Sequence, residues 1–115
     1  MDITSGSKGK YRKLVPAGQF WQREDMDALE QYVAVCITAG KPQVILDLER
    51  CTFINSQALG LLVRLHMRCS EEGGKLVLFR PAPCVREVIE VAGLPAFCTI
   101  VTTPDELDAL LESEG

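Results

Sequence analysis

Three polar residues stand where the pattern of this 115-residue chain changes from an apolar strand to an apolar helix: Asn55, Ser56 and Gln57. In open α/β sheets, the residues that bind or react usually lie at such strand-to-helix junctions. A serine hydroxyl there lies beside free backbone N–H groups and the positive end of a helix dipole. Two interpretations of Ser56 follow. It caps the helix together with Asn55, because Asn and Ser are favoured N-cap residues, or it is a functional hydroxyl.

Catalysis at Ser56 would require a nearby base, and His66 is the only histidine in the chain. In one continuous helix the ten residues between them correspond to roughly 15 Å, which is too far for direct proton transfer. We therefore expect His66 to be a surface or half-buried helix residue. Asp47 and Glu49 lie two residues apart on one face of a strand, but no third group completes an acid–base site. The sequence predicts no catalytic residue and a protein that is not an enzyme.

Motifs for cofactors and metals are missing from the sequence. It contains neither G-x-G-x-x-G nor G-x-x-x-x-G-K-[ST], and Gly73-Gly74-Lys75 is a helix stop. The five cysteines include no C-x-x-C pair, and a single histidine cannot form a histidine cluster. We predict no cofactor, no metal, and reduced, buried thiols of the kind found in cytoplasmic proteins.

The charge distribution argues against nucleic acid as a partner. The chain has a net charge of −4; its first 13 residues contribute +3, so the remainder carries −7. A nucleic-acid-binding domain needs a basic face that displaces counterions from phosphates. No segment approaches the roughly 18 apolar residues that span a bilayer, and the first residues lack the apolar core of a signal peptide. The sequence predicts a cytoplasmic protein without direct membrane insertion.

Strand and helix patterns alternate along the chain. Strand patterns cover residues 11–15, 44–48, 75–79 and 99–101, and helical periodicity covers residues 24–39, 56–70, 83–92 and 103–111. This alternation implies a mostly parallel sheet joined by right-handed crossovers. We predict one α/β domain over residues 11–111, with a central mixed, mostly parallel sheet of four to five strands and about four helices. Residues 1–10 are expected to form a flexible arm, and residues 112–115 a frayed terminus.

A polar stripe follows Ser56 along the predicted helix. Gln57, Gly60, Arg64 and Arg68 recur at spacings of three and four residues, whereas most of the remaining helix is apolar. The apolar residues are expected to face the sheet, so the stripe faces away from it.

The residues around Ser56 resemble the signature of the STAS domain, a family that comprises bacterial anti-sigma factor antagonists and cytoplasmic domains of sulfate transporters. Residues 44–48, VILDL, are similar to its strand V-x-L-D-[LF], and residues 53–60, FINSQALG, are similar to [FIM]-[IMV]-D-[ST]-[STA]-G-[LIV]-[GA]. Residues 74–78 and 91–97 resemble the family's third strand and its x-x-G-L-x-x-[LIF]-F segment. The similarity covers residues 11–111 and implies the STAS fold.

In this resemblance, Ser56 occupies the position of the phosphoacceptor serine of the antagonists. The resemblance implies that the unphosphorylated protein binds an anti-sigma factor that is also a serine kinase, of the histidine-kinase-like ATPase type. Phosphorylation would end the binding, and a PP2C-type phosphatase would restore it. The residues expected to bind the partner are Trp21, Asn55, Ser56, Gln57, Gly60 and Arg64.

The chain departs from the signature at four positions. Asn55 replaces the signature aspartate, Gln57 replaces a Ser or Thr, and Ala58 replaces a glycine, while Trp21 stands where the family has an aspartate after the first strand. We expect the loss of two carboxylates to change partner choice, kinase competence or both. Trp21, the only tryptophan, is either a core anchor or an exposed interface anchor, since Trp is enriched among interface hot spots.

A second function fits the same fold. Without a phosphorylation switch, the domain would be a constitutive accessory subunit, for example the STAS component of a lipid-transport ATP-binding-cassette complex. The altered residues around Ser56 favour this alternative.

Overall fold

The computed structural model describes residues 2–20 and 22–114. Within these residues the chain forms six strands, four α-helices and one short 3₁₀ helix, so the predicted α/β class is confirmed. The strands are β1 (Asp2–Lys8), β2 (Tyr11–Phe20), β3 (Gln43–Asp47), β4 (Cys51–Ile54), β5 (Lys75–Phe79) and β6 (Thr99–Val101). The helices are α1 (Arg23–Thr38), α2 (Ser56–Glu71), α3 (Pro83–Val91), η1 (Leu94–Ala96) and α4 (Pro104–Glu114).

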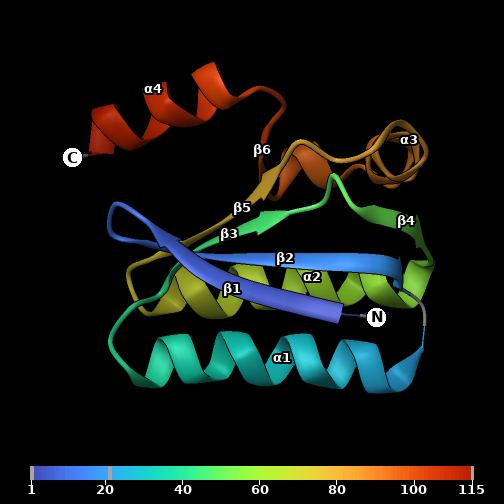
Figure 1. Ribbon diagram of the computed structural model, residues 1–115, viewed down its shortest axis with the longest axis horizontal. Coiled ribbons are helices and arrows are strands. Elements are labelled where there is room, and N and C mark those ends of the chain that lie inside the picture. Colours follow the sequence, from blue (N-terminus) through green and yellow to red (C-terminus); the bar gives the residue numbers. More distant parts are fainter. Residues whose placement is uncertain (1, 21, 115) are drawn as a thin grey trace.

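The strands form one mixed sheet in the order β1-β2-β3-β5-β6, and β4 pairs with the far end of β2. The β1–β2 pair is antiparallel, and the other described pairs are parallel. Helices α1 and α2 cover one face of the sheet, α4 covers the opposite face, and α3 lies against β4 (Figure 1). The sheet is mostly parallel, as predicted, but it has six strands instead of four to five.

Residues 2–8 form strand β1 and not the flexible arm that the sequence predicted. They pair with β2 along their whole length, from Asp2 opposite Ala17 to Lys8 opposite Tyr11. The sequence did not indicate this strand because most of its side chains are polar and exposed, and only Ile3 and Lys8 are half-buried. A polar strand at the edge of a sheet discourages pairing with other chains.

Two further segments differ from expectation. Residues 51–54, which lie outside the four predicted strand ranges, form β4; they are buried at Cys51 and Ile54 alone, a pattern without the alternation typical of strands. Helix α4 continues to Glu114, beyond the expected frayed end at residue 112. In its last turn the Ser113 hydroxyl donates to the Leu110 carbonyl oxygen (2.9 Å).

The larger core lies between the sheet and the layer of α1 and α2. Leu29 and Val33 of α1 and Leu62 and Leu65 of α2 are fully buried in it. Helix α2 is apolar over most of its circumference because it contacts both β5 and α1. This packing holds α1 and α2 side by side.

A second, smaller core lies on the opposite face, beneath α4. Its buried members are Tyr11, Ile45, Val77, Phe79, Val101 and Leu107. Strands β3 and β5 are therefore buried on both faces, which explains their nearly continuous apolar sequences.

Strand β2 changes partners in its middle, and this change positions β4. Leu14 is the last residue that pairs with β3, and Gly18 is the first that pairs with β4. Pro16 lies between them, where β2 pairs with neither β3 nor β4, and such interruptions of a ladder tolerate proline, which lacks a backbone N–H. Gly18 has a φ of 110°, a conformation that side chains disfavour, and the register shifts there. Residues 16–18 lie beyond the strand predicted over residues 11–15, but in the structure they belong to β2, which continues to Phe20.

A buried carboxylate, Asp47, ties together the ends of β3 and β5. Its side chain is only 2% exposed. The Arg80 guanidinium donates to it from Nε (3.2 Å to each oxygen) and from Nη2 (2.9 Å to Oδ2). Lys13 Nζ lies 3.6 Å from the same Oδ2. The carboxylate is thus held between two cations, as a buried charge requires.

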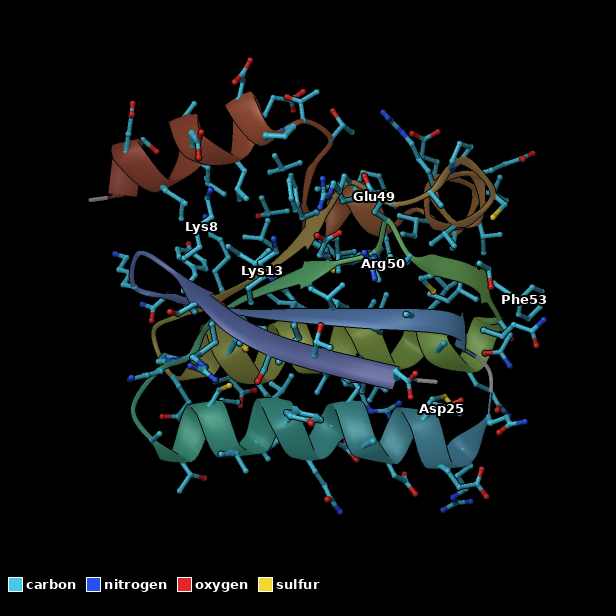
Figure 2. All side chains as sticks on the ribbon, in the orientation of Figure 1. Lys8, Lys13, Asp25, Glu49, Arg50 and Phe53 are labelled. Atoms are coloured by element: carbon cyan, nitrogen blue, oxygen red, sulfur yellow. The ribbon has the colours of Figure 1, made fainter. Side chains whose placement is uncertain are left out.

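Arg80 has an unusual backbone conformation where it makes this contact. Its φ is 38°, which is uncommon for a residue with a side chain. Its guanidinium also lies 4.9 Å from the Phe79 ring centroid and 3.3 Å from Glu49 Oε2. Figure 2 shows Glu49 and Arg50 in the loop that connects β3 to β4. The same ion cluster therefore restrains the segment that leads into β4.

We predict that the protein loses stability in alkaline solution through Cys69. Burial raises the pKa of the Cys69 thiol from 9.0 to about 11. Between these values the unfolded chain releases the proton and the folded chain keeps it, so the free energy of unfolding falls as the pH rises from 9 to 11. For one thiol, the free energy of unfolding falls by up to about 1.4 kcal/mol per pH unit in this range. Urea unfolding of the parent and of Cys69→Ala at several pH values measures this dependence. The prediction is contradicted if the free energy of unfolding falls equally steeply with pH in both proteins.

Candidate functional site

Asn55, and not Ser56, caps helix α2. The Asn55 backbone is extended, and its Oδ1 accepts a hydrogen bond from the Ala58 N–H (2.9 Å). The Asn55 carbonyl oxygen accepts the bond from Leu59 N–H (3.0 Å). Ser56 is the first residue of the helix and is exposed, and within the described residues its hydroxyl has no hydrogen-bond partner. The capping interpretation therefore applies to Asn55, which leaves the serine hydroxyl free.

The junction that carries Ser56 is rigidly anchored. Ile54 precedes it in β4 and is buried, and Ala58 and Leu59 follow it in the first turn of α2 and are buried as well. Gln57 is exposed beside the serine. Phe53 is 48% exposed and points away from the body of the molecule at the end where α2 begins (Figure 2). The serine hydroxyl is thus presented to solvent from a fixed backbone.

We expect Asn55→Ala to lower the free energy of unfolding by about 1 kcal/mol, because the Ala58 N–H loses its acceptor. Asn55→Asp is the matched control: it keeps an acceptor oxygen and adds a negative charge at the helix N-terminus, worth about 0.3–1 kcal/mol in favour of folding. Denaturant unfolding of the three proteins measures both effects. Equal stability of parent and Asn55→Ala would show that Ser56 can take over the cap.

Among the residues that the structure describes, no base is hydrogen-bonded to Ser56. His66 is half-buried on α2, as expected, and its Nδ1 is buried without a hydrogen-bond partner in the described residues. The described residues also contain no cluster of three or more His, Cys, Asp or Glu side chains that could hold a metal. All five cysteines are free thiols, and of these only Cys84 is exposed.

The polar stripe of α2 forms one wall of a groove. Gln57, Gly60 and Arg64 line a cavity of about 440 Å³ between α2 and the first half of α1. The cavity brings together three of the residues predicted to bind a partner; Ser56 does not line it, although Gln57, the next residue, does. Trp21, which the sequence also indicated, lies outside the described residues.

The opposite wall of the groove was not expected from the sequence. It consists of Arg23, Met26, Asp27 and Glu30 of α1. The charged members recur at spacings of four and three residues, a pattern that in isolation indicates only a solvated helix face. Which helix packs beside α2 depends on tertiary structure, so the sequence pattern could not identify this wall.

The exposed serine of α2 and the groove between α1 and α2 thus lie on one α/β domain. The chain belongs to the STAS domain family, whose model matches residues 24–107. No helix within residues 2–20 and 22–114 has the length and apolar character needed to cross a bilayer.

Known relatives and solved structures agree with this family. Two are named "putative anti-sigma factor antagonist": BtrV of Bordetella bronchiseptica, 34% identical over 67 residues, and a Thermotoga maritima protein of known structure, 21% identical with a TM-score of 0.85. The BtrV match covers 58% of this chain and 58% of BtrV. The Thermotoga match covers 96% of this chain and 94% of that one.

The anti-sigma factor antagonist SpoIIAA, a Bacillus cell fate determinant, shares the fold in two states. Its unphosphorylated form is 18% identical with a TM-score of 0.79 over 96% of this chain and 97% of its own. Its phosphorylated form is 18% identical with a TM-score of 0.71 over 95% of this chain and 99% of its own. At 18% identity, these two matches show a shared fold and nothing further.

Proposed function

We propose that this protein is a cytoplasmic anti-sigma factor antagonist that binds an anti-sigma factor with serine kinase activity, of the histidine-kinase-like ATPase type, and that phosphorylation of Ser56 ends the binding. The observation that carries the proposal is the free, exposed hydroxyl of Ser56 beside an asparagine that already caps the helix. The names of BtrV and SpoIIAA support the general role.

The switch follows from charge. The kinase transfers the γ-phosphoryl group of ATP to Ser56 Oγ and releases ADP and a proton; a PP2C-type phosphatase hydrolyses the ester and releases inorganic phosphate. The phosphate adds about −1.5 to −2 charges. Free N–H groups at the start of α2 stabilise that charge within the domain. A partner seated on the junction would have to desolvate it, so affinity falls.

Mass spectrometry tests the proposal. The protein is incubated with ATP, Mg²⁺ and, one at a time, the purified histidine-kinase-like ATPases encoded in its genome. We expect one added phosphate on Ser56 with the cognate kinase and none on Ser56→Ala. Absence of phosphate, or phosphate at another residue, would overturn the switch. Copurification with a transporter ATPase that is insensitive to phosphatase would favour the accessory-subunit alternative.

A further inference from the structure

The groove between α1 and α2 opens at the end of the molecule that carries Ser56. Both helices begin at this end (Figure 1), and Gln57, the residue after Ser56, lines the groove. Met26 is half-buried and Leu61 is 2% exposed, so these two form an apolar floor. A phosphate on Ser56 would therefore lie at the mouth of the groove.

Gly60 leaves a notch in the groove. A Cβ added at Gly60 would meet only the Arg64 Nη1, at 4.0 Å. A glycine in the interior of a helix costs stability relative to alanine. Here the missing side chain instead provides room above the apolar floor.

Two opposite charges that face the groove, Glu30 and Arg64, have no partner among the described residues. Arg23 and Asp27 of α1 lie 4.0 Å apart and satisfy each other. Glu30 on α1 and Arg64 on α2 line the same cavity, yet neither has an ion pair or hydrogen bond with another residue that the structure describes. An isolated cation or anion would complement only one of them. A peptide segment with both signs of charge complements both.

We infer that the α1–α2 groove holds a segment of the anti-sigma partner that carries an acidic side chain for Arg64, a basic side chain for Glu30 and an apolar side chain for the notch at Gly60. This inference rests on the proposed function. It makes α1 the second half of the docking surface and makes Glu30 and Arg64 the residues that select the partner, because a segment with reversed charges is repelled at both positions.

Charge reversal tests the two walls. Arg64→Glu and Glu30→Arg are compared with Arg68→Glu and Glu24→Arg, which make the same changes at exposed positions outside the groove. The probe is the purified ATPase that binds the parent, and the dissociation constant is measured by calorimetry. We expect each groove variant to bind at least about tenfold more weakly and each control to stay within about threefold of the parent.

Substitution of Gly60 tests the notch. Gly60→Leu fills it and should weaken binding at least about tenfold, while its thermal midpoint stays at or above that of the parent because leucine favours helix. Gly60→Ala is the matched control: it stabilises the helix in the same way but protrudes little, so it should bind within about threefold of the parent.

The outcomes separate the two proposals. If none of the ATPases binds the parent, the proposed function fails and this inference fails with it. If one binds the parent and the groove variants bind as well as their controls, the inference alone is overturned. Equal weakening by groove variants and controls would also overturn it, because it would indicate a general effect of net charge.

Discussion

We expect Ser56→Asp to weaken binding to the proposed anti-sigma partner by at least about tenfold, since a charge buried at an interface without a partner costs roughly 2–5 kcal/mol. The free energy of unfolding will hardly change. The Ser56 hydroxyl is exposed and has no hydrogen-bond partner among the described residues, and a carboxylate at the first helical position is favoured by about 0.3–1 kcal/mol. The expected result is a protein that is as stable as the parent and binds poorly.

Two variants control this experiment. Ser56→Ala removes the phosphate acceptor without adding charge and should bind whether or not the kinase and ATP are present. Ser70→Asp makes the same charge change at an exposed position near the other end of α2 and should bind like the parent. Dissociation constants and denaturant unfolding are measured for all four proteins. Full binding by Ser56→Asp, or lost binding by Ser56→Ala, would contradict a charge-operated switch at this residue.

Arg80→Ala will lower the free energy of unfolding by about 3–5 kcal/mol, because it leaves the buried Asp47 carboxylate without its main partner. Domains of this kind have only about 5–15 kcal/mol in total. Asp47→Asn should cost less, since Glu49 Oε2, 3.3 Å from Arg80 Nη1, still neutralises the half-buried guanidinium. Both losses are read from denaturant unfolding curves.

A surface pair provides the matched comparison. Arg86 and Glu90 on α3 are also 2.9 Å apart, but their side chains are 49% and 55% exposed. Arg86→Ala should therefore cost less than about 1 kcal/mol. Since the two ion pairs have the same separation, the difference between the variants measures the burial of Asp47 together with the additional contacts of Arg80. Equal losses would show that burial of Asp47 does not set the strength of the cluster.

The elements that the sequence predicted are those with a strong local pattern. Residues 44–48 and 75–79 are apolar except for Asp47 and Lys75, and such nearly continuous runs fit strands covered on both faces. Strand β1 has no such pattern, since it is recognised only by its pairing with β2. Likewise the partner of Asp47 is Arg80, 33 residues away, and only the β3–β5 register brings them together.

The sequence predicted only those parts of the candidate site that depend on a local pattern. The junction at Ser56 is local, so the sequence located it. Two adjacent residues, Asn55 and Ser56, could each cap a helix, and only the backbone geometry assigns that task to Asn55. The α1 wall of the groove depends on which helices pack together, which no periodicity in α1 specifies.

The cap at Asn55 has a consequence for the lifetime of the protein in the cell. Because a neighbouring residue holds the first turn of α2, the proposed phosphorylation of Ser56 would leave that turn intact. Proteases in the cell act on the unfolded fraction of a protein, which depends on its stability. The two forms should therefore be degraded at the same rate, and the total amount of the protein should stay constant while the share that is phosphorylated changes.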